Sequence, residues 1–252
     1  MFSAMESLSY HGSWFPTFLA TFCLIYITGY FLVFRNWSPK HRPEASSCFI
    51  SLSHGTPAAF LAAAAILAHP VRCFAAPNSE PQNLVLDFSI AYFVADLLHL
   101  VLIACDRDYL FIAHHLATLF VFVTCRYMVL HGAFAILVLL VLAEATSLCQ
   151  NVWTLAGLRK AEWAFAEDVY RVLSPPFYIL YTLMRGFAGP WFFYKMSAFY
   201  LSGKGGDVIP MWLAVAWIVV VGGAISVSIL WISNLWVKLY AEKKGKGDKK
   251  ER

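Results

Sequence analysis

Residues 109–130 read YLFIAHHLATLFVFVTCRYMVL. This run is long enough to cross a bilayer, because a spanning helix needs about 20 mostly apolar residues. It places two imidazoles, those of His114 and His115, where hydrocarbon would normally lie. Ionisable side chains at such depth cost roughly 2.5 kcal/mol or more each, and they persist mainly where they face a bundle interior or a water-filled cavity. The pair therefore predicts a polar site inside a membrane bundle.

The composition of the whole chain indicates the same class. Apolar residues make up 60% of the sequence and charged residues 13%, with a mean hydropathy of +0.63, far from an average soluble domain. We predict an all-α polytopic membrane protein with about seven transmembrane helices, whose partners are membrane lipids and not nucleic acid. The predicted spans are Trp14–Phe34, Cys48–Ala68, Leu84–Ala104, Tyr109–Leu130, Ala133–Leu155, Val172–Tyr194 and Pro210–Leu235.

The distribution of Lys and Arg predicts the orientation, because positive residues near helix ends stay on the cytosolic side. If the C-terminus is cytosolic, 14 of the 19 Lys and Arg residues lie in cytosolic segments and 3 lie on the opposite side. Arg126 and Arg185 fall within spans. This asymmetry favours seven helices over six or eight, with a lumenal N-terminus.

The C-terminal tail carries a candidate address. Lys249 and Lys250 stand fourth and third from the end of the chain, which resembles the dilysine signal for retrieval to the endoplasmic reticulum, read by coat-protein machinery. The alternative is a solvated charge run that attracts anionic lipid. We expect a multi-pass protein of the endoplasmic reticulum membrane.

Three regions follow from these spans. Residues 1–47 would hold the lumenal N-terminus, the first span and a cytosolic loop. Residues 48–237 would hold the other six helices, and residues 238–252 a basic cytosolic tail.

Counting along the helices brings polar residues of three spans to similar depth. From the turn at Arg107, His99 lies 8 residues back, and His114 and His115 lie 7 and 8 residues forward, roughly 10 to 12 Å into the membrane. Asp96 is one turn deeper than His99. The turn at His131 and Gly132 places Glu144 in the layer of Asp96.

This layer has two interpretations. A histidine beside a carboxylate can act as a general base, with the carboxylate fixing the tautomer. The simpler alternative is that the groups only join helices, at about 0.6 kcal/mol per interhelical bond. Arg185 or Arg126 could hold an anionic headgroup or a coenzyme phosphate, although Arg126 more simply snorkels to the interface.

Three segments resemble the TLC family, the membrane domain shared by ceramide synthases and translocating-chain-associated membrane proteins. They are Tyr92–Leu98 with its Asp96, the HHxxT core of His114, His115 and Thr118, and Glu144–Ser147 followed by Asn151. The resemblance implies six helices, the second to seventh, in a ring around a central cavity, with the first span outside it.

The resemblance also implies a chemistry. Ceramide synthases transfer an acyl chain from acyl-CoA to the amine of a sphingoid base, so one of His114 and His115 would be a general base or an acyl acceptor. The implied catalytic set is His114, His115, Asp96 and Glu144. The implied supporting residues are His99, Thr118, Ser147, Asn151 and Arg185.

Residues 143–147, AEATS, lack the His and the second Asp of the longer ceramide-synthase motif. The chain is therefore more similar to the smaller TLC-domain proteins, whose general role is lipid homeostasis. Sphingoid-base N-acylation and a non-catalytic role in translocation or cargo export remain as alternatives, and the chain could form a homo-oligomer.

We expect no bound cofactor or metal, with acyl-CoA as a candidate co-substrate. A di-iron hydroxylase would need several histidine boxes, and only one His-His pair occurs.

Overall fold

The computed structural model describes residues 13–104 and 109–248, and the regular elements in these ranges are all helices. Lys249 and Lys250, the candidate retrieval signal, lie outside the described residues, as does Arg107. In chain order the elements are α1 (Phe15–Thr28), η1 (Gly29–Val33), α2 (Arg42–Ala68), α3 (Glu80–Leu102), α4 (Tyr109–Val123), η2 (Thr124–Val129), α5 (Ala133–Glu144), α6 (Ser147–Arg159), α7 (Ala164–Tyr181), η3 (Thr182–Ala188), α8 (Gly189–Leu201) and α9 (Met211–Asp248), where η marks a π-helical segment.

The predicted multi-pass membrane architecture is confirmed. Six helices in the described ranges are long and apolar enough to cross a bilayer. The remaining predicted span, Val172–Tyr194, lies within the continuous helix formed by α7, η3 and α8. It is not among the six, because its prolines and Arg185 lower its mean hydropathy. That continuous helix still provides the seventh helical unit of the bundle.

Two predicted boundaries are corrected. The predicted span Cys48–Ala68 begins earlier, at Arg42, and Pro57 lies inside the unbroken α2. The predicted span Ala133–Leu155 is broken at Ala145 and Thr146, where α5 ends and α6 begins. This break lies beside Glu144 and Ser147, both members of the candidate site.

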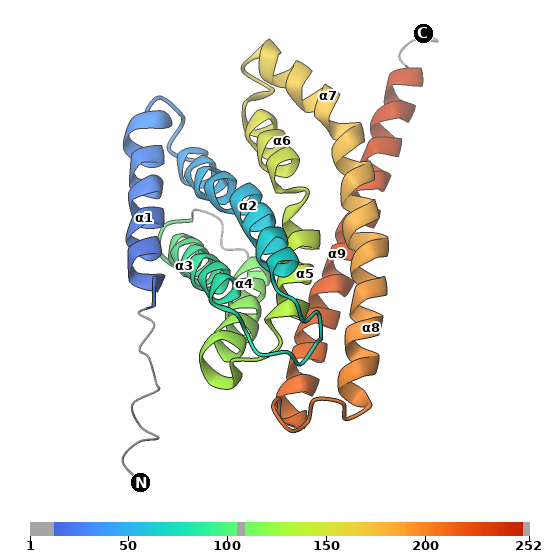
Figure 1. Ribbon diagram of the computed structural model, residues 1–252. Helices are drawn as coiled ribbons and strands as arrows, with labels where there is room; N and C mark the ends of the chain where they lie inside the picture. The colour runs from blue at the N-terminus through green and yellow to red at the C-terminus, as the bar shows by residue number, and fades with distance from the viewer. Residues whose placement is uncertain (1–12, 105–108, 249–252) are drawn as a thin grey trace.

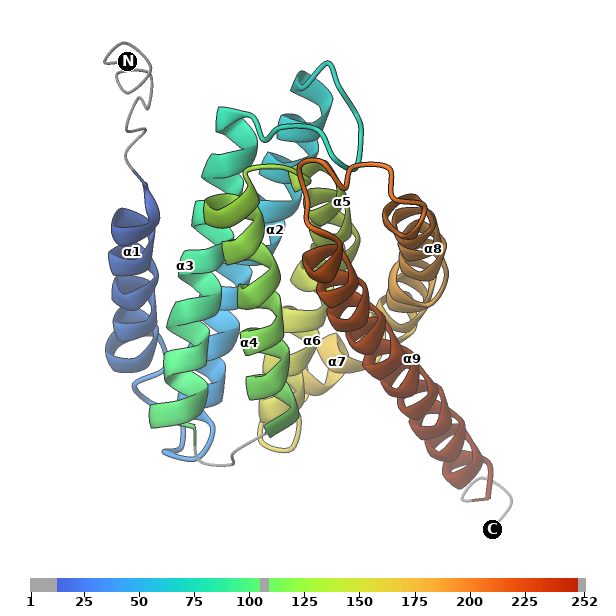
Figure 2. The ribbon, with the colours of Figure 1, turned by 90° about the horizontal axis from the view of Figure 1, so that it is seen from below.

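Six helical units form a closed ring. Contacts run from α2 to α3, from α3 to α4, from α4 to α9, from α9 to the helix of α7, η3 and α8, from that helix to α5 and α6, and from these back to α2. In Figure 2, α1 lies outside these six units, at the edge of the bundle beside α3. The helix α1 begins at one end of the bundle and α9 finishes at the other (Figure 1). We call these the Ser13 end and the Trp37 end, after the loop residues found there.

Small residues let α2 pack closely on its neighbours in the ring. Ala58, Ala62 and Ala65 are buried along α2, and α2 makes extensive contact with α5. Small side chains allow helix backbones to approach in a membrane, where no hydrophobic force drives helices together. The close approach positions the first half of α2 beside the polar residues of α3 and α6.

Turns at the Ser13 end are tightly capped. Ser79 and Gln82 form a capping box at the start of α3. Asn78 donates to the carbonyl of Cys125 at 3.0 Å and accepts from the amide of Ala133 at 2.9 Å. Gly132 adopts a φ of 90°, a left-handed conformation that glycine takes without strain. These bonds hold α3, η2 and α5 in register.

Candidate functional site

The two histidines of the pair have different environments. Nε2 of His115 lies 2.9 Å from Oδ2 of Asp96 on α3, and Nδ1 of His115 lies 2.9 Å from the carbonyl oxygen of Phe111. The side chains of His115 and Asp96 are only 5% and 8% exposed. Ser47 of α2 donates to the other carboxylate oxygen of Asp96 at 2.6 Å. One buried carboxylate thus joins α2, α3 and α4.

These contacts occupy both ring nitrogens of His115. A carbonyl oxygen only accepts, so Nδ1 carries a proton. Neither nitrogen is therefore free for a substrate, which makes His115 a positioning residue.

His114 is the accessible imidazole of the pair. It is exposed, and its side chain makes no hydrogen bond within the described ranges. Its ring contacts those of His115 and Phe93, with centroid separations of 5.8 and 6.5 Å. Arg185 lies within electrostatic reach of it. His114 is therefore the histidine whose nitrogens can reach a ligand.

Glu144 lies at the break between α5 and α6. Its Oε2 accepts a hydrogen bond from Ser147 at the start of α6. Asn151, one turn further, donates to Ser51 of α2 at 2.9 Å and to the carbonyl of Ser147 at 2.9 Å. Glu144, Ser147 and Asn151 therefore form one connected group facing α2.

Arg185 reaches the same region from η3. It donates to the carbonyl of Ala143 at 2.8 Å, and its guanidinium carbon lies 5.0 Å from the centre of the Tyr181 ring. Its Nε is buried without a hydrogen-bond partner. The charge of Arg185 acts on both His114 and Glu144.

The other two predicted supporting residues are less central. His99 is buried, and its Nδ1 lies 3.0 Å from the hydroxyl of Tyr26 on α1. It thus connects the region of Asp96 to the helix outside the ring. Thr118 is partly buried on α4, one turn beyond His114, and takes no part in the hydrogen bonds described above.

Several residues that the sequence analysis did not single out complete the site. Ser47, Ser51 and Gly55 follow each other at intervals of four on α2, which places them on one face. A Cβ atom at Gly55 would lie 2.5 Å from Cβ of Ser147 and 2.6 Å from Oε2 of Glu144. This spacing of small residues was the available signal, but it did not identify their partners.

His54 is a further residue that the sequence analysis did not single out. It is fully buried within α2. It stacks on Tyr92 with a centroid separation of 4.0 Å, and its Nε2 lies 3.1 Å from Oγ of Ser89. It joins α2 to α3 one turn beyond the polar residues of the site.

The expectation that Arg126 snorkels to the interface was wrong. Its Nε and Nη2 lie 2.9 and 3.4 Å from the carboxylate of Asp87, and their side chains are 11% and 1% exposed. Tyr127 donates to the same carboxylate at 2.7 Å, and the backbone amide of Trp14 donates to it at 3.2 Å. This ion pair joins α1, α3 and η2 at the Ser13 end, away from the histidines.

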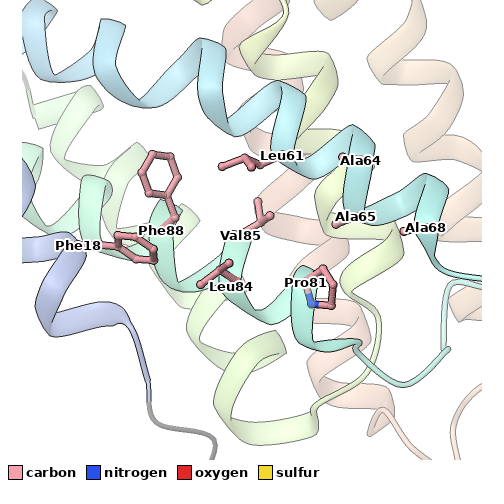
Figure 3. A pocket seen from close by; sticks show the side chains of 9 residues that line it. All are labelled: Phe18, Leu61, Ala64, Ala65, Ala68, Pro81, Leu84, Val85 and Phe88. Atoms are coloured by element: carbon pink, nitrogen blue, oxygen red, sulfur yellow. The ribbon is translucent and has the colours of Figure 1, made fainter.

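An apolar groove also lies towards the Ser13 end (Figure 3). It has a volume of about 320 Å³ and is lined by Phe18, Leu61, Ala64, Ala65, Ala68, Pro81, Leu84, Val85 and Phe88. These residues come from α1, α2 and α3. Its apolar lining offers no group for chemistry, in contrast to the polar region near the Trp37 end.

Comparisons with known proteins agree on the family. The profile described as the TLC domain matches residues 44–237. The chain is also similar to a protein of Arabidopsis thaliana named as a TLC domain-containing protein, with 57% identity over 231 residues, covering 91% of each chain. No solved structure matches the chain. Each of His114, His115, Asp96, Glu144 and Arg185 lies inside the matched range.

Proposed function

Because the chain belongs to the TLC-domain family, we propose that it acts on membrane lipids in the endoplasmic reticulum, where it controls their composition. The proposed location is supported by Lys249 and Lys250 near the end of the chain and by the excess of positive residues in the predicted cytosolic segments. In this orientation the Trp37 end faces the cytosol. The polar region then lies nearer the cytosolic leaflet.

The observation that carries the proposal is the division of roles between the paired histidines. His115 is held at both nitrogens by Asp96 and the Phe111 carbonyl. These two contacts fix the ring orientation of His115 and the backbone of α4 at the position next to His114. A free imidazole inside a membrane bundle, on a helix held by its neighbour, is suited to proton transfer at a lipid headgroup.

Acyl transfer to an amine is the specific reaction that the resemblance to ceramide synthases implies, and an accessible imidazole can serve it. His114 would remove the proton of a sphingoid-base amine while the nitrogen attacks the thioester carbonyl of an acyl-CoA. The carbon–nitrogen bond forms, the carbon–sulfur bond breaks, and coenzyme A leaves as a thiol after taking up the proton. In the alternative sequence, a nitrogen of His114 attacks the thioester carbonyl, the carbon–sulfur bond breaks, and coenzyme A leaves as a thiol with the imidazole proton. The amine then attacks the acyl-imidazole, the amide bond forms, the bond to His114 breaks, and the amine proton returns to the imidazole.

A direct assay tests the proposal. Purified protein in detergent is supplied with a long-chain acyl-CoA and a sphingoid base, and the amide product is measured for wild type, His114→Ala and His69→Ala. His69 serves as the matched control because it lies in the loop after α2, bonded locally to Val71. We expect product from wild type and from the control, and a loss of more than about a hundredfold in His114→Ala.

Two other outcomes have clear meanings. A lipid that co-purifies and is not converted, in wild type and His114→Ala alike, would contradict a catalytic role and favour a lipid-binding or cargo-export role. Equal product from all three proteins would show that another group performs the chemistry.

A further inference from the structure

Two arginines that fall within predicted spans, Arg126 and Arg185, differ in their pairing. Both lie on π-helical segments, Arg126 on η2 and Arg185 on η3, and such segments occur frequently at functional sites. Arg126 is neutralised by the buried carboxylate of Asp87. Arg185 makes no ion pair with any acid in the described ranges. Its one hydrogen bond within those ranges is to the uncharged carbonyl of Ala143.

Glu144 forms no ion pair with Arg185 in the described ranges, although the charges of the two groups interact. One oxygen of Glu144 accepts a hydrogen bond from Ser147. The side chain of Arg185 is held by Tyr181 and Ala143, and its Nε donor remains unused.

An unpaired guanidinium at this depth is unfavourable by several kcal/mol unless an anion accompanies it. Arginine is always charged and presents a planar set of donors that matches carboxylate and phosphate groups. Arg185 is only partly buried, so its remaining donors are open to a ligand. His114, also exposed, stands within electrostatic reach.

We propose that Arg185 binds the oxyanion, a phosphate or a carboxylate, of an amphiphilic lipid and so places that lipid beside His114. The ligand is amphiphilic because it must enter from a bilayer and place an acyl chain among apolar helices. The inference rests on the proposed function in taking a lipid as the ligand of this site. It concerns binding alone and does not require turnover.

Three probes with the same chain test the binding and identify its source. Oleate carries a carboxylate, 1-oleoyl lysophosphatidate carries a phosphate, and mono-oleoylglycerol is uncharged. Affinities for the purified full chain are measured by native mass spectrometry or by quenching of tryptophan fluorescence. We expect at least one anionic probe to bind wild type about ten- to a hundredfold more tightly than mono-oleoylglycerol, as a charge-assisted hydrogen bond would give.

The variants are Arg185→Met, Arg185→Lys and the matched control Arg171→Met. Arg171 is exposed on α7 and paired with Asp168, so its loss removes one charge without touching the site. We expect the anionic preference to disappear in Arg185→Met, to persist in part in Arg185→Lys and to be unchanged in the control. Equal affinity of wild type for all three probes, or an unchanged preference in Arg185→Met, would overturn the proposal.

The same measurement separates this proposal from acyl transfer. Binding without product in wild type would leave the Arg185 site standing and remove the proposed reaction. If Arg185→Met does not fold, the wild-type probe comparison and Arg185→Lys still decide the matter.

Discussion

Oδ2 of Asp96 lies 2.9 Å from Nε2 of His115, across the interface between α3 and α4. This single contact makes the His-His pair asymmetric. It occupies the second histidine, whereas the first, His114, is exposed. Adjacent residues differ in direction by about 100° around a helix, so one histidine of the pair can be held by Asp96 while the other remains unbonded.

Asp96→Ala should destabilise the fold. The change removes the partner of His115 and of Ser47 and leaves buried donors without an acceptor, which costs about 1.5–3 kcal/mol. Thermal unfolding in detergent should show a lower Tm than wild type. Asp96→Asn, which keeps the shape and one acceptor, should lose less. Equal Tm values for wild type and Asp96→Ala would contradict the role of this carboxylate.

His114 and His115 should differ in their effects on stability. His115→Ala breaks two hydrogen bonds on a buried side chain, whereas His114→Ala changes an exposed side chain, with an expected effect within about 0.5 kcal/mol. We expect a Tm decrease of several degrees in His115→Ala only. Similar decreases in both variants would mean that His114 is structural.

Gly55→Ala should disturb the approach of α2 to the start of α6. The added Cβ would meet Ser147 at 2.5 Å, and overpacking of this kind costs about 1–3 kcal/mol. Gly223→Ala on α9 is the matched control, because nothing lies within 4 Å of its added Cβ. The control should be neutral or more stable by up to about 1 kcal/mol, since alanine favours helix. A Gly55→Ala protein as stable as the control would disprove the close contact.

The ion pair of Arg126 and Asp87 should give a strong double-mutant coupling. Removing either partner alone leaves a buried charge and should cost about 3–5 kcal/mol. The double variant Arg126→Met with Asp87→Leu should recover much of that loss, because no unpaired charge remains. Chemical unfolding of the four proteins measures the coupling. Additive losses would show that the two side chains do not interact.

The tail lysines should direct location. Lys249→Ala with Lys250→Ala should move a fluorescent fusion, tagged at the N-terminus, from the endoplasmic reticulum to later compartments. Lys243→Ala with Lys244→Ala is the matched control, because it removes the same charge from the same tail. Equal redistribution of both variants would indicate that charge, and not the position of the lysines, retains the protein.

Much of the candidate site could be predicted from spacing. Residue counts from the turns placed Asp96, His114, His115 and Glu144 at similar depth, because a helix rises by a constant amount per residue. Their partners could not be counted in this way. Ser47 and Ser51 bond to Asp96 and Asn151 only because α2 packs on α3 and α6 at a particular rotation.

Arg126 and Arg185 show the same limit. Both are arginines in apolar runs, and nothing in their neighbours along the chain distinguishes them. Only the fold places Asp87 beside Arg126 and leaves Arg185 without an ion pair among the residues that the structure describes.

From the amino-acid order alone follow the helical class and most of the spans. The physical reason is that the bilayer offers no water to the backbone, so every backbone polar group must bond within a helix. A sufficiently long apolar segment therefore forms a spanning helix. The tertiary structure alone decides which imidazole is free, which arginine is paired and why residue 55 is glycine. Those properties depend on the rotation and distance of neighbouring helices, which are set by contacts between residues far apart in the chain.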